Sequence, residues 1–164
     1  MPYTYEYPRP ALTVDCIIFG FDRNSLKLLL FQRKVEPFQG EWSLIGSFVK
    51  PEESVYVAAE NILKTHTGLT DVFMEELGCY GSVERDPGAR VISIAHYALM
   101  RLAEENKQII QTYKAQWFEF DQLPDLILDH QQMVEDALEK LRRKTRYRPI
   151  GFELLPEKFT IPQL

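Results

Sequence analysis

Residues 46–69, with the sequence GSFVKPEESVYVAAENILKTHTGL, decide the fold because they specify a turn, an amphipathic helix and a helix stop. Residues 52–54 follow a proline and suit a first helical turn, where acidic side chains complement the positive end of the helix. Apolar residues and a histidine recur at three- and four-residue spacing over residues 55–66, which predicts that one helix face packs inward. Gly68 predicts the end of the helix. The leucine after it is expected to make the hydrophobic contact that accompanies such a helix end.

The layout of this stretch resembles the Nudix box of pyrophosphohydrolases. The family pattern is Gly, any five residues, Glu, any seven, then Arg-Glu-apolar-any-Glu-Glu-any-Gly-apolar. Aligned on Gly68, the first Glu of the pattern falls on Glu53 and the apolar position falls on Leu63. The other box positions are degenerate: they hold Ser47 for the opening Gly, Asn61 for Arg, Ile62 for Glu, and Thr65 and His66 for the Glu-Glu pair.

The missing carboxylates predict a loss of hydrolysis. Nudix enzymes cluster carboxylates on the box helix because hard divalent cations need anionic oxygen ligands near a pyrophosphate. Here Glu53 is isolated, and Glu60 lies outside the register of the pattern. We therefore expect no catalytic residue, no metal site and no cofactor. An active Mg²⁺-dependent hydrolase of nucleoside diphosphate derivatives, which would use Glu53 and Glu60, is the alternative.

The composition is that of a soluble globular chain, with 164 residues, 45% apolar residues and 26% charged residues. A net charge of -5 argues against this segment alone binding nucleic acid. The N-terminal residues form no apolar signal core, and no stretch is long enough to span a membrane, so we expect a cytoplasmic location. Cys16 and Cys79 lie in strand-like apolar runs, which predicts two buried free thiols.

The remaining chain predicts an α/β fold. Apolar, β-branched runs indicate strands at residues 11–21, 26–34, 43–49, 72–83, 91–102 and 115–120, and a helix at residues 129–146 with Asp129 as its cap. Gly78 and Gly81 predict a bend or bulge, and His96 is expected to be a buried sheet histidine. The resemblance implies that these elements form the Nudix α/β/α sandwich with a mixed sheet.

Two stretches outside the box place polar residues where a ligand could bind. Asp15 is a carboxylate inside an apolar strand, which suits either a ligand pocket or a solvent-facing edge. Residues 84–90, ERDPGAR, carry charges around a turn and suit either a ligand loop or a solvated hairpin. The candidate ligand-binding residues are Asp15, Arg33, Glu41, Trp42, Arg85, Asp86 and Arg90.

Residues 84–99, 117–130 and 147–164 resemble segments of Nudix-related bacterial transcriptional regulators. In those regulators a degenerate Nudix domain senses a small molecule and precedes a winged helix-turn-helix domain. The resemblance implies an effector-sensing domain at residues 1–148, and a linker with the start of a winged helix-turn-helix at residues 149–164. The residues that match this start are Leu154, Leu155, Pro156, Phe159, Thr160 and Leu164.

The implied partners are a small-molecule effector, a second copy in a homodimer, and DNA through a downstream domain. One branch of these regulators senses ADP-ribose and another senses pentoses such as arabinose. Ile45 and Ser47 depart from the Leu-Pro-Gly-Gly sequence of the ADP-ribose branch, which favours a sugar. A purely structural dimerisation module with an empty cleft is a further alternative.

Overall fold

The computed structural model describes residues 3–23, 25–70, 72–103 and 114–147. The described elements, in chain order, are β1 (Ala11–Phe21), β2 (Leu26–Gln32), β3 (Trp42–Ser43), β4 (Ile45–Phe48), α1 (Val55–Thr67), β5 (Glu75–Tyr80), β6 (Val91–Arg101), β7 (Ala115–Glu119), the 3-10 turn η1 (Phe120–Gln122) and α3 (His130–Tyr147). No helix in this part of the chain is long and apolar enough to cross a membrane. The predicted helix-turn-helix start lies outside the described residues.

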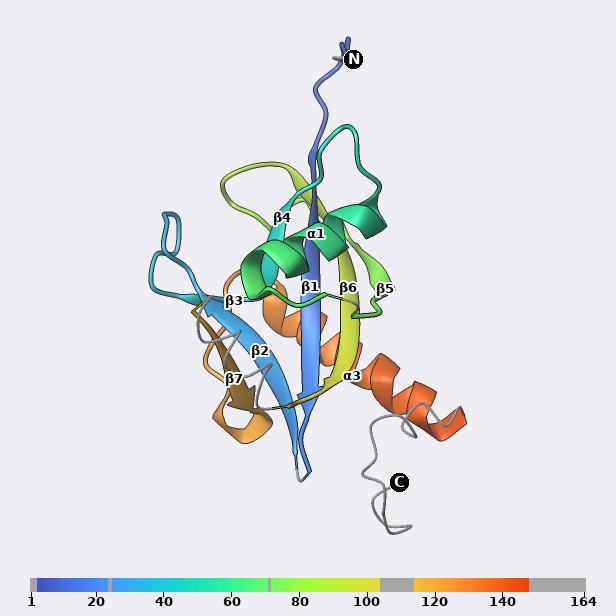
Figure 1. Cartoon of the computed structure of the whole chain (residues 1–164). Coiled ribbons are helices and arrows are strands. Elements are labelled where there is room, and N and C mark those ends of the chain that lie inside the picture. The colour runs from blue at the N-terminus through green and yellow to red at the C-terminus, as the bar shows by residue number, and fades with distance from the viewer. Residues whose placement is uncertain (1–2, 24, 71, 104–113, 148–164) are drawn as a thin grey trace.

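The strands form one mixed sheet in the order β3-β2-β1-β6-β5, with β4 on β1 and β7 on β2. β1 and β6 run parallel over their whole length, and the other strand pairs are antiparallel. Helix α1 covers one face of the sheet and α3 covers the other (Figure 1). This arrangement confirms the predicted α/β class and the Nudix architecture with its mixed sheet.

Successive side chains of β1 point to opposite faces of the sheet, and both of these faces are covered by a helix. Val14 and Cys16 point to the core beneath α1, whereas Ile17 and Phe19 point to the core beneath α3. Because both faces are buried, the strand is a nearly continuous apolar run rather than an alternating one. Asp15 shares the α3 face of the strand, so its carboxylate enters the layer that the apolar odd-numbered residues occupy.

Helix α1 begins later than the sequence predicted. The first helical residue is Val55, and the Ser54 hydroxyl caps the helix by accepting from the amide of Val57. The first turn therefore contains no acidic residue, and Glu53 lies in the preceding turn. The inward face and the stop at Gly68 are confirmed, with Gly68 in the left-handed conformation at φ 71°.

The predicted strand over residues 43–49 is split into β3, which pairs with β2, and β4, which pairs with β1. Leu44 lies at the break, where the chain changes partners. Its amide belongs to neither strand and donates to the ring of His130 at the start of α3. The switch between partner strands therefore ties the middle of the sheet to α3.

Other strand boundaries also differ from the prediction. β2 ends at Gln32, and β5 covers Glu75–Tyr80 only. The register shifts between Glu76 and Gly78, which confirms a bulge at Gly78, whereas Gly81 lies beyond the strand. Both cysteines are free, but Cys79 is exposed because its side of β5 faces solvent, so the prediction of burial is correct only for Cys16.

Candidate functional site

A cavity of about 670 Å³ opens at the end of the sheet where β1, β4 and the start of α3 meet. Its walls come from β1, the loop after β2, the β3–β4 segment, the loop before β6 and the segment leading into α3. The polar and charged residues that line it include Thr13, Asp15, Arg33, Lys34, Ser43, Ser47, His66, Arg85, Asp86, Lys114 and His130. Four of these are buried: Asp15, Ser43, Arg85 and His130. Asp15 contacts both Arg85 and His130 at the floor of the cavity, and Asp129 supports the floor from outside the lining by pairing with Arg85.

Asp15 is 7% exposed and lies opposite Gly46 in the β1–β4 ladder. The hydroxyl of Ser93 donates to Asp15 Oδ2 at 2.6 Å. A Cβ atom on Gly46 would lie 2.2 Å from Asp15 Oδ1, so only glycine leaves room for this carboxyl group. The structure thus decides between the two alternatives for Asp15: it faces the cavity and not a solvent-exposed edge.

Arg85 is the cationic member of the floor. Its side chain is 3% exposed, and it donates to both carboxylate oxygens of Asp129, from Nε at 2.9 Å and from Nη2 at 2.8 Å. The same Nη2 lies 3.9 Å from Asp15 Oδ2. A paired, two-point contact of this kind fixes the guanidinium plane. The solvated-hairpin alternative is therefore wrong for Arg85.

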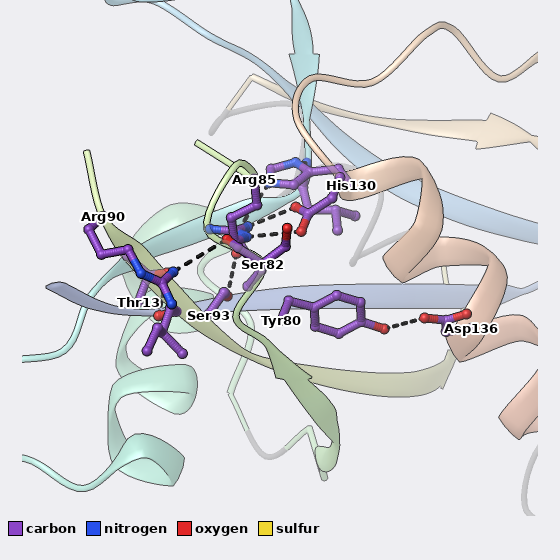
Figure 2. A network of polar contacts seen from close by, with 12 residues as sticks. Thr13, Tyr80, Ser82, Arg85, Arg90, Ser93, His130 and Asp136 are labelled. Carbon is purple, nitrogen blue, oxygen red and sulfur yellow. Dashed lines mark hydrogen bonds and ion pairs between the residues drawn. The ribbon is translucent and has the colours of Figure 1, made fainter. Parts of the chain in front are cut away.

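His130 completes the floor from the first residue of α3. Its Nδ1 accepts from the amide of Leu44 at 3.1 Å, so the ring proton resides on Nε2, which lies 3.5 Å from Asp15 Oδ1. Burial lowers the pKa of His130, although Asp15 and Asp129 act in the opposite direction. A neutral imidazole is consistent with the hydrogen bond from Leu44. Figure 2 shows Arg85 and His130 side by side within this network.

The rim of the cavity differs from its floor. Arg33, Lys34 and Lys114 line the cavity and also a smaller neighbouring one of about 360 Å³. Arg33 is oriented by a hydrogen bond from its Nε to the carbonyl of Pro37 at 2.9 Å. The rim thus presents three cations against one carboxylate, Glu36, and this excess of positive charge suits phosphate or another anion.

The cavity brings together only part of the residues predicted from the sequence. Of the seven ligand candidates, it is lined by Asp15, Arg33, Arg85 and Asp86. Trp42 lines the smaller cavity and packs edge-on against Phe118, with ring centroids 4.8 Å apart. Glu41 and Arg90 line neither cavity, and Arg90 donates to the carbonyls of Gly81 and Ser82.

Ser93, Lys114 and His130 were not predicted as site residues. Asp129 was predicted only as a helix cap; its carbonyl does accept from the Met133 amide, while its carboxylate pairs with Arg85. An Asp-His pair at the start of a helix was the available signal, but capping explains such a pair without any ligand.

The box positions of α1 carry no comparable cluster. Ile62 is buried in the core beneath α1, Thr65 is exposed, and His66 lies at the edge of the cavity rather than packing inward. Glu53 accepts from the Lys50 amide and from the side chain of Asn61, and these contacts lower the pKa of Glu53.

These side chains do not fit the divalent cation that a Nudix box implies, because an apolar group, a hydroxyl and an imidazole stand where carboxylates are needed. Among the described residues, no group of three or more His, Cys, Asp or Glu side chains is placed to hold a metal ion.

A mixed sheet between two helices, with a box-like helix beside a polar cavity, defines the Nudix architecture. Residues 9–138 match the NUDIX domain family, and the chain belongs to that family.

The chain is 31% identical over 163 residues to the ADPR responsive transcriptional repressor NtrR of Acinetobacter baylyi, covering 97% of this chain and 65% of NtrR. It is also 37% identical over 132 residues to an ADP-ribose pyrophosphatase of Methanocaldococcus jannaschii, covering 80% of this chain and 75% of that enzyme.

Solved structures of Shewanella oneidensis NrtR share the fold. One is 32% identical with a TM-score of 0.79, covering 93% of this chain and 73% of that one. The NUDIX domain of the same protein, complexed with ADP ribose, is 30% identical with a TM-score of 0.71, covering 82% of this chain and 90% of that one. The chain is thus similar both to regulators and to an ADP-ribose hydrolase.

Proposed function

We propose that this chain is the effector-sensing part of a transcriptional regulator, and that it binds ADP-ribose without hydrolysing it. The cavity provides the most direct support, because its cations suit a diphosphate while the neighbouring box helix lacks the carboxylates that would hold a metal ion. The relatives add support, since one is an ADPR responsive repressor and another is a NUDIX domain complexed with ADP ribose.

A pentose such as arabinose fits the proposal less well. The departure of Ile45 and Ser47 from the Leu-Pro-Gly-Gly sequence favoured a sugar, but a sugar carries no anion for the rim cations. The repressor, the pyrophosphatase and the solved NUDIX domain complex are all described by ADP-ribose and not by a pentose.

Regulation would follow if the ligand prefers one arrangement of two DNA-reading domains in a homodimer over another. A ligand shifts an equilibrium only by the difference in its affinity for the two states. DNA contact would come from a downstream domain, as residues 149–164 suggest by sequence, and the homodimer is likewise part of the proposal.

Titration of the protein with ADP-ribose, once in Mg²⁺ and once in EDTA, tests the sensor proposal. We expect the same Kd in both solutions and unchanged ADP-ribose after prolonged incubation, measured by chromatography. A hundredfold excess over Kd should add about 2.7 kcal/mol to the free energy of unfolding and so raise the melting temperature.

The second candidate function is ADP-ribose hydrolysis, which the 37% identity to a pyrophosphatase favours. This candidate predicts Mg²⁺-dependent release of AMP and ribose 5-phosphate, and loss of that release in Glu53→Gln. Detection of those products would replace the sensor proposal with the enzyme. If ADP-ribose neither binds nor reacts, both candidates fail.

A further inference from the structure

The floor and the rim of the cavity differ in their balance of charge. The rim offers three cations, Arg33, Lys34 and Lys114, which carry hydrogen-bond donors, and one carboxylate, Glu36. On the floor, the single guanidinium is already paired with Asp129 through two hydrogen bonds. The floor groups left to interact with a ligand are therefore the carboxyl group of Asp15, which can accept, and the Nε2–H of His130, which can donate.

One oxygen of Asp15 retains capacity to accept. Oδ2 already accepts from Ser93 at 2.6 Å, whereas Oδ1 lies 3.5 Å from His130 Nε2, beyond the usual 2.7–3.2 Å of an N–H···O bond. An oxygen in this position can accept from a ligand hydroxyl, and hydrogen bonds to ionised acceptors are the shorter and stronger kind.

An anion at the floor would be poorly accommodated. Two carboxyl groups, from Asp15 and Asp129, already face one guanidinium, and His130 is neutral. A phosphate at this depth would meet like charge in a buried setting without a free cation among the described floor residues. The same phosphate at the rim would meet three cations and one carboxylate, Glu36, and so a net positive charge.

We propose that Asp15 sets the orientation of the ligand: the terminal ribose of ADP-ribose enters first and gives a hydroxyl to Asp15 Oδ1, while the diphosphate stays at the Arg33–Lys34–Lys114 rim. This inference rests on the proposed function. The ligand has two ends, and a closed floor must receive one of them. The terminal ribose brings several hydroxyl donors, whereas the adenine end brings one amino group.

Binding of ADP-ribose and of ADP, which lacks the terminal ribose, tests the orientation in the whole chain. Wild-type protein is expected to bind ADP-ribose at least about tenfold more tightly, even though ADP carries more negative charge for the rim. This comparison uses wild-type protein alone, so its result stays valid even if a substitution prevents folding. Equal or tighter binding of ADP overturns the inference.

Two variants locate the preference. Asp15→Asn should weaken the binding of ADP-ribose by about tenfold or more and change the Kd of ADP by no more than about threefold. The preference for ADP-ribose over ADP, which is the ratio of the two Kd values, is then largely lost. Lys114→Ala should weaken both ligands by a similar factor and keep the ratio. Because the ratio compares two ligands on one protein, a partial loss of folded protein does not move it.

Glu41→Gln is the matched control, since it makes the same acid-to-amide change at a residue that lines neither cavity. It should retain the preference for ADP-ribose. If Asp15→Asn weakens ADP-ribose and ADP equally, the adenosine end occupies the floor and the orientation is wrong, while the proposed function stands. If wild-type protein does not bind ADP-ribose, the proposed function itself fails and the orientation fails with it.

Discussion

Helix α1 and the cavity floor differ in where they place ionisable groups. On α1, where the Nudix pattern calls for clustered carboxylates, the chain has a buried isoleucine and neutral or exposed side chains. On the floor, Asp15, Arg85 and Asp129 are joined by contacts of 3.9 Å or less. The contrast shows that a chain with the family fold can have a polar cavity although its box helix mainly packs against the sheet.

Removing the floor cation should have the largest effect on stability. In Arg85→Met, the carboxyl groups of Asp15 and Asp129 lose their shared guanidinium, and breaking such a buried pair costs about 3–5 kcal/mol. Asp129 keeps a 23% exposed side chain, so we expect about 3 kcal/mol, measured by urea unfolding. Arg90→Met is the control on the same loop, and its exposed hydrogen bonds should contribute less than about 1 kcal/mol. Equal losses in the two variants would contradict a buried floor.

Restoring a box carboxylate should have the next largest effect. Ile62→Glu places a charge in the core beneath α1 and should lower the free energy of unfolding by roughly 2–4 kcal/mol. Thr65→Glu adds a carboxylate to the exposed part of the same helix and should change stability by no more than about 0.5 kcal/mol. Thermal unfolding of both variants measures the difference. A tolerated Ile62→Glu would show that this helix face can still accommodate metal-binding chemistry.

A smaller effect is expected from pH. Burial lowers the pKa of His130 in the folded protein, so the unfolded chain takes up this proton first as the pH falls. The contribution of His130 to stability is therefore complete above about pH 6.5 and is lost as the pH falls toward the folded pKa, by at most about 1.4 kcal/mol per pH unit.

Unfolding measured between pH 7.5 and 5 should show a shallower slope in His130→Asn, whose side-chain oxygen can still accept from Leu44. Burial also lowers the pKa of His96, so part of the slope should remain in the variant. The carboxyl groups of Asp15 and Asp129 face His130 in both proteins and do not explain a difference. Identical slopes would mean that His130 is not neutral in the fold.

The smallest effect is expected at the one surviving box carboxylate. Glu53→Gln keeps one acceptor oxygen for either the Lys50 amide or Asn61, and the hydrogen bond it loses lies in an exposed turn, so stability should change by less than about 1 kcal/mol. Binding of ADP-ribose in EDTA should also be unaffected, which calorimetry can measure. A marked loss of binding would place Glu53 in the site and weaken the contrast between α1 and the floor.

The fold was largely predictable from the sequence because it depends on local patterns. Three features were predicted from residues that are adjacent in the sequence. They are the apolar spacing of residues 55–66, the helix stop at Gly68 and the β-branched run of β1. Boundaries were less accurate: a serine cap moved the start of α1, and a change of partner strand divided residues 43–49 into β3 and β4. Such a change depends on pairing across the sheet, which a local pattern does not contain.

The cavity floor was only partly predictable. Asp15 and Arg85 were identified because a carboxylate in an apolar strand and a charged turn are unusual locally. Their partners were missed because Arg85 and Asp129 are 44 residues apart, and Ser93 and Asp15 are 78 apart. The parallel pairing of β1 with β6 brings the second pair together. A serine and a helix-capping aspartate give no local signal of such long-range contacts.

Helix α3 is also a rod with one end in the cavity floor. Its 18 residues rise about 1.5 Å each, so it is about 27 Å long. Hydrogen bonds from Tyr80 to Asp136 and from Lys140 to the carbonyl of Glu76 fasten its middle to β5. A tilt of about 5° at His130 would displace the far end at Tyr147 by about 2 Å. The hydrogen bonds to β5 oppose that displacement, so the helix braces the cavity floor against the sheet.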